Sequence, residues 1–178
     1  MRPGPLEAQS LDDLEAAVSL NLRCAMQCLQ ALPPGMKGAG FARVANISSR
    51  AALGMRRRTV YAATKAALIG MTKVWALELG RHGITANALG PGPIGAAPFD
   101  AANPPGSPAT RPILEAIPVG RAGEPADVAH AVAFLLDARS GFVTGQVLYV
   151  CGGRSRRGAP LLHNWLRGPG IGPADRSG

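Results

Sequence analysis

The chain has 178 residues, enough for one domain with a hydrophobic core. Hydrophobic residues form 47% of it and charged residues 17%, which excludes disorder throughout the chain. No apolar run is long enough to cross a bilayer, and the first ten residues lack the apolar core of a signal peptide. We therefore expect a cytoplasmic protein that spans no membrane.

The net charge of +8 is unevenly distributed along the chain. Residues 154–178 hold five arginines against one aspartate, a net +4, and a second cluster is Arg56–Arg58. Basic charge can attract phosphates or nucleic acid, but neither stacking aromatics nor a recognition motif accompanies these arginines. We therefore expect residues 154–178, which are also rich in Gly and Pro, to form a poorly ordered basic tail, and we do not expect a nucleic-acid partner.

The first predicted elements are a helix and a strand. Residues 10–33 have helical features: Ser10 can cap the N-terminus, acidic residues occupy the first turns, and Pro33-Pro34-Gly35 predicts the end. Residues 41–48 follow as a short strand.

The cysteines are expected to be reduced, because their number is odd and no export signal is present. We expect Cys24, Cys28 and Cys151 to pack as small apolar residues. The three histidines are scattered, so we expect no metal site.

Helices and strands alternate through the rest of the chain. Such an alternation, with mostly apolar strands, predicts a layered α/β fold with parallel strand pairing. The predicted elements are a helix at 59–80, a strand at 83–92, a loop from Pro91 to about Pro112, a helix at 124–138 and a strand at 145–153.

Tyr61 and Lys65 lie one helical turn apart in a segment that is otherwise small or apolar. Positions i and i+4 share a face of a helix, so the phenol and the ammonium are expected to be neighbours. A nearby positive charge favours the phenolate, and such a tyrosine can exchange a proton with an alcohol or carbonyl oxygen. Taken alone, the pair is more simply explained as a surface tyrosine and a solvated lysine.

Other polar residues stand where a ligand could bind. Ser48 and Ser49 end the strand before the tyrosine helix, and ligands of open α/β sheets bind beyond the carboxyl ends of the strands. Asn21 lies within the first helix, where asparagine is not favoured. Pro91 and Gly92 follow the next strand and would let the backbone approach a ligand closely.

These features, taken in order, resemble the classical short-chain dehydrogenases/reductases. The resemblance extends from about Pro5 to Gly153, and it implies a Rossmann-type doubly wound parallel sheet. The motifs that carry it are Asn21, NISS at 46–49, YAATK at 61–65, NALGPGPI at 87–94, VGRAGEPADVAHAVAFLLD at 119–137 and VTGQVLYVCGG at 143–153.

The resemblance implies roles for four catalytic residues. Tyr61 would be the general acid/base that exchanges a proton with the substrate oxygen. Lys65 would acidify the tyrosine and hold the ribose of the nicotinamide cofactor. Ser49, with Ser48 as the fallback, would bind the substrate carbonyl, and Asn21 would anchor a water linked to Lys65.

The resemblance also implies a cofactor and a substrate class. Pro91, Gly92 and Ile94 would line the nicotinamide side of NAD or NADP, beside Tyr61 and Lys65. The threonine that the family usually carries near Ala96 is absent. An alcohol or ketone would be the substrate, and a homo-oligomer is implied, because the helices that carry Asn21 and Tyr61 commonly form a subunit interface.

The front of the family pattern has no counterpart in this sequence. Before Asn21 the one glycine is Gly4, so the glycine-rich turn that holds the cofactor diphosphate is missing. We expect an incomplete domain over residues 1–153, an exposed strand edge at 41–47 and impaired cofactor binding. A gene fragment or a misplaced start codon would explain such a sequence.

Three functions are therefore compared. The first is an NAD(P)(H)-dependent oxidoreductase. The second is a catalytically inactive fragment that keeps a subunit-interface or partner-binding role. The third is a nucleic-acid binder acting through the arginines from Arg154 onward, and we rank it last. The substrate and the choice between NAD and NADP stay open, because the residues that select them vary or are absent.

Overall fold

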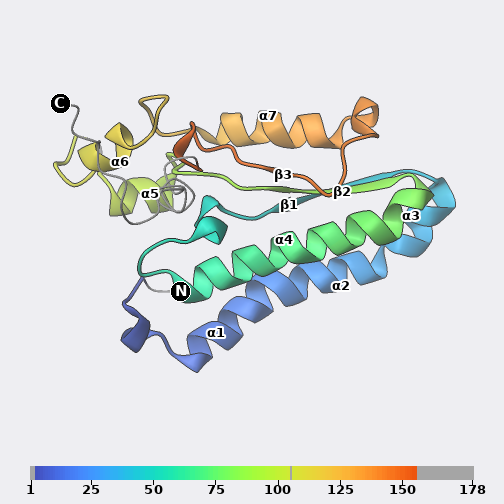
Figure 1. Cartoon of the computed structure of the whole chain (residues 1–178), viewed down its shortest axis with the longest axis horizontal. Helices are drawn as coiled ribbons and strands as arrows, with labels where there is room; N and C mark the ends of the chain where they lie inside the picture. Colours follow the sequence, from blue (N-terminus) through green and yellow to red (C-terminus); the bar gives the residue numbers. More distant parts are fainter. Residues whose placement is uncertain (1–2, 105, 156–178) are drawn as a thin grey trace, which may run out of the picture.

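A parallel sheet of three strands forms the middle of the structure, a computed structural model that describes residues 3–104 and 106–155 (Figure 1). The strands are β1 (Ala42–Ile47), β2 (Ile84–Leu89) and β3 (Val147–Leu148), in the order β1-β2-β3. The register runs from Ala42 opposite Ile84 to Ile47 opposite Leu89. The predicted parallel pairing is confirmed.

Helices cover both faces of this sheet, as Figure 1 shows, so the predicted α/β layering is confirmed. One face carries α4 (Thr59–Leu79) and α2 (Cys24–Ala31), and the other carries α7 (Pro125–Leu136). The remaining helices are α1 (Leu11–Val18), α3 (Pro33–Ala39), α5 (Ala97–Ala102) and α6 (Arg111–Glu115), with a π-helical segment at Ser19–Arg23 and 3-10 turns at Leu6–Ala8, Arg50–Leu53, Gly80–His82 and Ala138–Ser140.

The central strand β2 is buried along its whole length, because helices pack on both of its faces. Alternate residues of a strand point to opposite faces. Ile84 therefore packs with Leu29, Ala42 and Leu79 on the α4 side. Leu89 packs with the α7 residues Ala131 and Leu135 on the other side.

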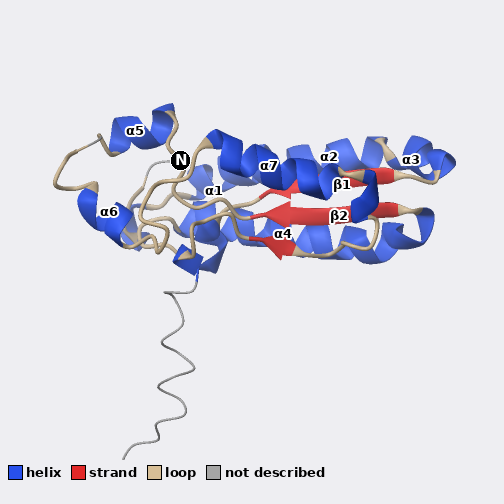
Figure 2. Cartoon of the chain, turned by 90° about the horizontal axis from the view of Figure 1, so that it is seen from above, coloured by secondary structure: helices blue, strands red, loops and turns tan. Residues whose placement is uncertain are grey.

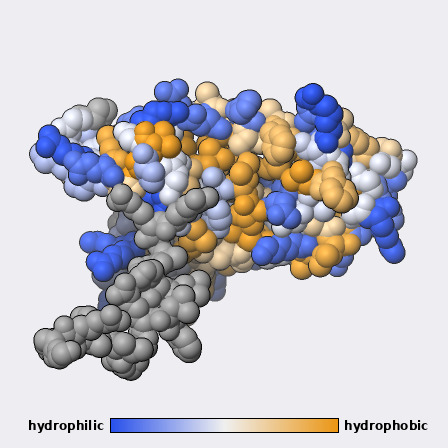
Figure 3. Space-filling model, turned by 45° about the horizontal axis from the view of Figure 1, so that its top comes forward, coloured by the Kyte–Doolittle hydropathy of each residue, from blue (hydrophilic) through white to orange (hydrophobic). Residues whose placement is uncertain are grey.

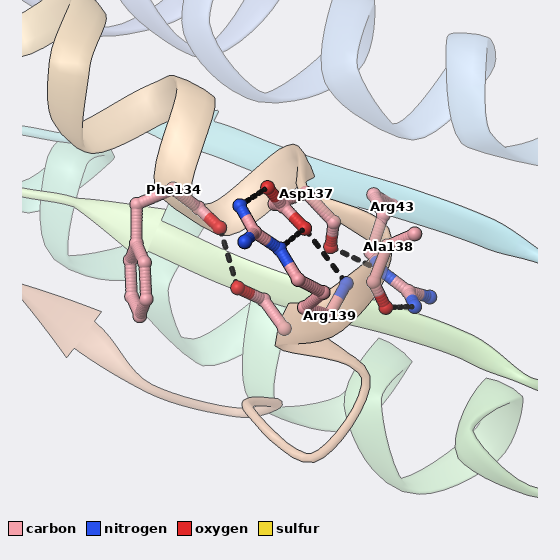
Figure 4. Close-up of polar contacts among 6 residues, drawn as sticks. Arg43, Phe134, Asp137, Ala138 and Arg139 are labelled. Carbon is pink, nitrogen blue, oxygen red and sulfur yellow. Dashed lines mark hydrogen bonds and ion pairs between the residues drawn. The ribbon is translucent and has the colours of Figure 1, made fainter.

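Arg43 ties the C-terminal end of α7 to β1, as Figure 4 shows. Its Nε donates to the carbonyl oxygen of Asp137 at 3.3 Å, and its Nη2 donates to that of Ala138 at 3.0 Å. Asp137 is held in turn by an ion pair with Arg139 at 2.7 Å. The bonds from Arg43 thus pair the carbonyl groups of the turn that follows α7.

The first helical region departs from the prediction in two ways. Ser10 caps α1 as predicted, its Oγ accepting from the amide of Asp13 at 3.0 Å. The helix then widens into the π-helical segment Ser19–Arg23 before α2. Pro33 and Pro34 begin α3 instead of ending the helical region, because proline fits the first turn of a helix, where its missing N–H is not needed.

Two further predictions need correction. The expected loop from Pro91 to Pro112 contains α5, and α6 begins at its end. Cys24 and Cys28 are exposed, whereas Cys151 is buried as expected, because α2 turns Leu29 toward the sheet and the two cysteines away from it.

β1 lies at an edge of the sheet within the described residues, as predicted, and its last residue, Ile47, is 43% exposed. No helix in the described residues is long and apolar enough to cross a membrane. The expected tail lies, from residue 156 onward, outside the described part of the chain, so the domain boundary at 153 stays a prediction.

Candidate active site

All predicted site residues except Asn21 lie on segments at one end of the sheet. The strands run in the same direction, so their carboxyl ends meet at the end where α5 and α6 lie (Figure 2). The 3-10 turn Arg50–Leu53 follows β1 there, and α4 begins beside it. Ligands of open parallel sheets bind at this edge.

Tyr61 and Lys65 occupy the first two turns of α4. The Nζ atom of Lys65 lies 5.8 Å from the centroid of the Tyr61 ring, so the two side chains share a face of the helix. The buried face of α4 carries Val60, Thr64 and Leu68, which leaves this pair half-buried on its flank. The prediction that the phenol of Tyr61 and the ammonium of Lys65 are neighbours is confirmed.

Lys65 is held by β1. Its Nζ donates a hydrogen bond to the carbonyl oxygen of Ile47 at 2.8 Å. Burial lowers the pKa of Lys65 below its usual value of 10.5, because a half-buried ammonium has lost part of its hydration. The lysine is therefore a positioned, partly desolvated cation.

The two serines at the end of β1 have different surroundings. Ser48 is buried, and its Oγ donates to the carbonyl oxygen of Lys65 at 2.7 Å, so this hydroxyl fastens α4 to the sheet. Ser49 is half-buried, and its Oγ accepts from the amide of Ala51 at 3.1 Å. The hydroxyl of Ser48 is thus a donor to the backbone of α4, whereas within the described residues the hydroxyl of Ser49 only accepts.

Asn21 reaches the start of α4 through a threonine. It lies in the π-helical segment, a kind of distortion that is frequent at functional sites. Its Nδ2 donates to Oγ1 of Thr64 at 3.1 Å, and Thr64 Oγ1 donates to the carbonyl oxygen of Tyr61 at 3.0 Å. The expected water between Asn21 and Lys65 stays a prediction.

The segment after β2 packs closely against its neighbours. The carbonyl oxygen of Pro91 accepts from the amide of Arg50 at 2.9 Å, and Gly92 donates to the carbonyl oxygen of Val150 at 2.9 Å. A Cβ at Gly92 would lie 2.7 Å from the Cβ of Cys151, so glycine is required there. Pro91 and Gly92 thus connect the carboxyl ends of β1 and β3.

Ile94 faces a cavity of about 330 Å³ at the same end of the molecule. Its backbone lies beside Gly123, whose carbonyl oxygen accepts from Gly95 at 2.8 Å. Apolar side chains, among them Ile117 and Val119, and the phenol of Tyr149 line the cavity. The lining also includes charged side chains, so the wall of the cavity is only partly apolar.

Thr64 and Tyr149 were missed by sequence reasoning. Thr64 lies three residues after Tyr61 and could have been noticed as a polar residue on the buried face of a helix. Tyr149 could not have been found from the sequence, because nothing in the residues around it indicates that its side chain lines a cavity. Among the described residues, no group of three or more His, Cys, Asp or Glu side chains could hold a metal ion.

Comparison with known proteins gives relatives over nearly the whole described region. The family model described as Enoyl-(Acyl carrier protein) reductase matches residues 1–155. The (2S)-[(R)-hydroxy(phenyl)methyl]succinyl-CoA dehydrogenase subunit BbsD of Thauera aromatica is 43% identical over 154 residues, covering 86% of this chain and 61% of that protein. The 3-oxoacyl-[acyl-carrier-protein] reductase FabG of Thermotoga maritima is 38% identical over 143 residues, covering 80% and 57%.

A solved structure agrees with this result. The gluconate 5-dehydrogenase of Burkholderia cenocepacia, in complex with NADP and tartrate, superposes with a TM-score of 0.80 at 33% identity, over 87% of this chain and 61% of that one. The chain thus spans about three fifths of the length of these relatives. The Rossmann-type fold expected from the motifs is confirmed, and the chain belongs to the short-chain dehydrogenase/reductase family.

Proposed function

We propose that this chain carries the catalytic residues of an NAD(P)(H)-dependent oxidoreductase that acts on an alcohol or ketone, with Tyr61 as general acid/base. The observation that supports this most is the pairing of Tyr61 with Lys65 on one flank of α4, at the carboxyl edge of the sheet. Family membership supports the same reaction class.

The residues at this edge suit the nicotinamide end of such a cofactor. Ile94 offers apolar surface in the cavity, Pro91 and Gly92 precede it on the segment after β2, and Lys65 offers a cation for a ribose hydroxyl. When bound, the cofactor supplies a nicotinamide carbon that accepts or donates a hydride. In this proposal Pro91, Gly92, Ile94, Tyr61 and Lys65 hold it.

The protein side chains handle the proton. In the oxidation direction Tyr61 Oη takes the proton of the substrate hydroxyl group. A hydride leaves the carbon that bears this hydroxyl for the nicotinamide, which yields the ketone. Ser49 Oγ donates a hydrogen bond to the reacting oxygen and fixes its position. Lys65 Nζ lies 5.8 Å from the centroid of the Tyr61 ring, and the partial burial of this ammonium reduces the screening of its charge by water.

The substrate class is proposed from the relatives. Two of them are named for acyl groups carried as thioesters, one on coenzyme A and one on an acyl carrier protein. We therefore propose a hydroxyacyl or oxoacyl thioester as the alcohol or ketone. These relatives are longer than the present chain, so their activities are only proposed for it.

Cofactor binding is proposed to be weakened in this chain. Between residue 3 and β1 the structure has helices and turns but no strand that could precede a glycine-rich, phosphate-binding turn. Residues proposed for the nicotinamide end of the site therefore lie in the described part of the chain, whereas we identify no residues there for the diphosphate.

A second candidate is an inactive, partner-binding protein, and exposed apolar surface favours it. On α4, Leu77 is 85% exposed and Val74 is 49% exposed. The α7 side also shows apolar surface across its middle (Figure 3), and Phe142 near its end is fully exposed. Such surface supports association with a second copy, the homo-oligomer expected from the family.

Titration calorimetry distinguishes the two candidates. The purified chain is titrated with NADH and NADPH, and turnover of a 3-oxoacyl thioester is followed by nicotinamide absorbance. Binding with turnover supports the oxidoreductase. Association of the chain without binding of either cofactor supports the second candidate.

A further inference from the structure

The start of α4, which carries Tyr61, has no side-chain cap. Its N-cap residue, Arg58, makes no side-chain hydrogen bond to the first turn. The preceding residue, Arg57, has a φ of 61°, a left-handed conformation that residues other than glycine rarely adopt. The first amide groups of a helix have no partner within the helix, so an uncapped start tends to fray. Tyr61 lies in this first turn, so its position depends on support from outside the helix.

Thr64 holds the backbone of Tyr61. Its Oγ1 donates a hydrogen bond to the carbonyl oxygen of Tyr61 at 3.0 Å, and the residue is 1% exposed. A threonine hydroxyl has one hydrogen to donate. Because this hydrogen is directed at Tyr61, the oxygen of Thr64 is left as an acceptor for a donor outside α4.

Asn21 is that donor. Its Nδ2 donates to Thr64 Oγ1 at 3.1 Å, across 43 positions of the sequence. Within the described residues, this is the hydrogen bond that the side chain of Asn21 makes. The two bonds in series connect the first helical region to the carbonyl group of Tyr61. Hydrogen bonds in such a chain polarise and strengthen one another where water is excluded.

The π-helical segment places Asn21 against α4. Asn21 is the middle residue of Ser19–Arg23, and the amide of Cys24 donates to the carbonyl oxygen of Ser19, five residues back. Such a widened turn is rare in proteins. The segment packs against α4, beside which α1 and α2 lie in Figure 1. The distortion therefore occurs where the first helical region holds the helix that carries the tyrosine.

A second buried threonine of α4 has the same bonding pattern away from the site. Thr72 is also 1% exposed, and its Oγ1 donates to the carbonyl oxygen of Leu68 at 2.7 Å. It accepts from Nδ2 of Asn46 at 2.8 Å. The two threonines differ in the carbonyl group that they hold, which belongs to Tyr61 in one case and to Leu68 in the other. Thr72 is therefore a matched control for Thr64.

We propose that Asn21 is a positioning residue that acts on Tyr61 through the hydroxyl of Thr64. The inference rests on the oxidoreductase proposed above, in which Tyr61 handles the proton. The two bonds hold the first turn of α4 so that the phenol stays beside Lys65 at the carboxyl edge of the sheet. Neither Asn21 nor Thr64 touches the substrate. Misplacing a reacting group by about 1 Å can lower a rate by about 10², so such support affects kcat.

A double-mutant cycle tests whether Asn21 acts through Thr64. N21A should lower kcat about tenfold in the wild-type background, with KM unchanged, and should have no further effect in the T64V background. T64S keeps the hydroxyl and should restore the kcat that T64V loses, whereas T72V should keep the wild-type kcat. The proposal is overturned if N21A has no effect in the wild type, if its tenfold loss persists beside T64V, or if T72V lowers kcat as much as T64V.

A readout without turnover separates this inference from the proposed function. Tyr61 and Tyr149 are the two tyrosines of the chain, so in a Tyr149→Phe background fluorotyrosine labels Tyr61 alone. The fluorine NMR resonance of Tyr61 should be one narrow line, which N21A and T64V both shift or broaden and T72V leaves unchanged.

A resonance that N21A changes and T64V does not would overturn the proposal, as would one that neither variant changes. If the wild-type chain does not turn over a 3-oxoacyl thioester, the proposed function fails. The resonance of Tyr61 then still decides whether Asn21 acts on the tyrosine through Thr64.

Discussion

Lys65 donates a hydrogen bond from Nζ to the carbonyl oxygen of Ile47, 2.8 Å away, on the open side of β1. The amide of the next residue, Ser48, points the other way and donates to Leu89 of β2 at 2.7 Å. Successive residues of a strand direct their backbone groups to opposite sides, so the lysine takes a carbonyl that a further strand would otherwise contact. The lysine proposed for catalysis thus also pairs a backbone carbonyl at the edge of the sheet.

Replacing Tyr61 by Phe should abolish oxidoreductase activity. The change removes one hydroxyl group from a half-buried ring and keeps the packing, so the free energy of unfolding should change by less than about 1 kcal/mol. Loss of a general acid/base should lower kcat by about 10²–10⁴. Stopped-flow measurement of NADPH oxidation and urea unfolding check the two parts, and normal turnover in the variant would sink the assignment.

Lys65 should give the protein a pH-dependent stability at alkaline pH. Its pKa in the folded state lies below 10.5, so between that lowered pKa and about pH 10.5 the unfolded state binds more protons. The contribution of this group to the free energy of unfolding therefore rises with pH in that window. Urea unfolding from pH 8 upward should show a steeper rise for the wild type than for Lys65→Met, and identical slopes would contradict the burial of the ammonium.

Thr64 should matter for activity more than its neighbour along the same face, Thr72. Thr64→Val breaks the connection from Asn21 to the carbonyl of Tyr61, and Thr72→Val breaks the 2.8 Å bond from Asn46. Each loss leaves an amide without its partner and should cost about 1–3 kcal/mol of stability. A fall in kcat confined to Thr64→Val is expected in steady-state assays; equal effects of the two variants would show that the threonine connection has only a structural role.

Gly92 should not tolerate a side chain. In Gly92→Ala the new Cβ would meet Cβ and Cα of Cys151 at 2.7 and 2.8 Å, which requires the backbone to move. Gly95→Ala is the matched control, because its nearest neighbour is 3.6 Å away. We expect thermal unfolding to show a loss of about 1–3 kcal/mol for the first and little change for the second. Equal stability of the two variants would refute the close approach of the chain after β2 to Cys151.

Association is expected to depend on the exposed face of α4. Leu77→Gln changes a side chain that is 85% exposed, so the monomer should keep its stability while the association constant falls. Phe142→Gln makes a similar change on the α7 side. Analytical ultracentrifugation of both variants identifies the face that associates. If only Phe142→Gln weakens association, the interface lies on the α7 side and not on α4.

The sequence determined the elements whose signals are local. The helix predicted at 59–80, and found at Thr59–Leu79, followed from alanine-rich composition and helical spacing. The shared face of Tyr61 and Lys65 followed from helix geometry alone. The strands β1 and β2 followed from short apolar runs, and their parallel pairing from the intervening helix. The order of the motifs identified the family before any contact was known.

The tertiary structure decided which partner each polar group meets. The sequence could not show that the hydroxyl of Ser48 donates to the backbone of α4 whereas that of Ser49 accepts from Ala51, since the two serines are adjacent. It could not find α5 within a proline-rich loop or the exposure of Cys24 and Cys28. These outcomes depend on residues far apart in the chain, and only packing sets such contacts, whereas periodicity and capping act within a few residues.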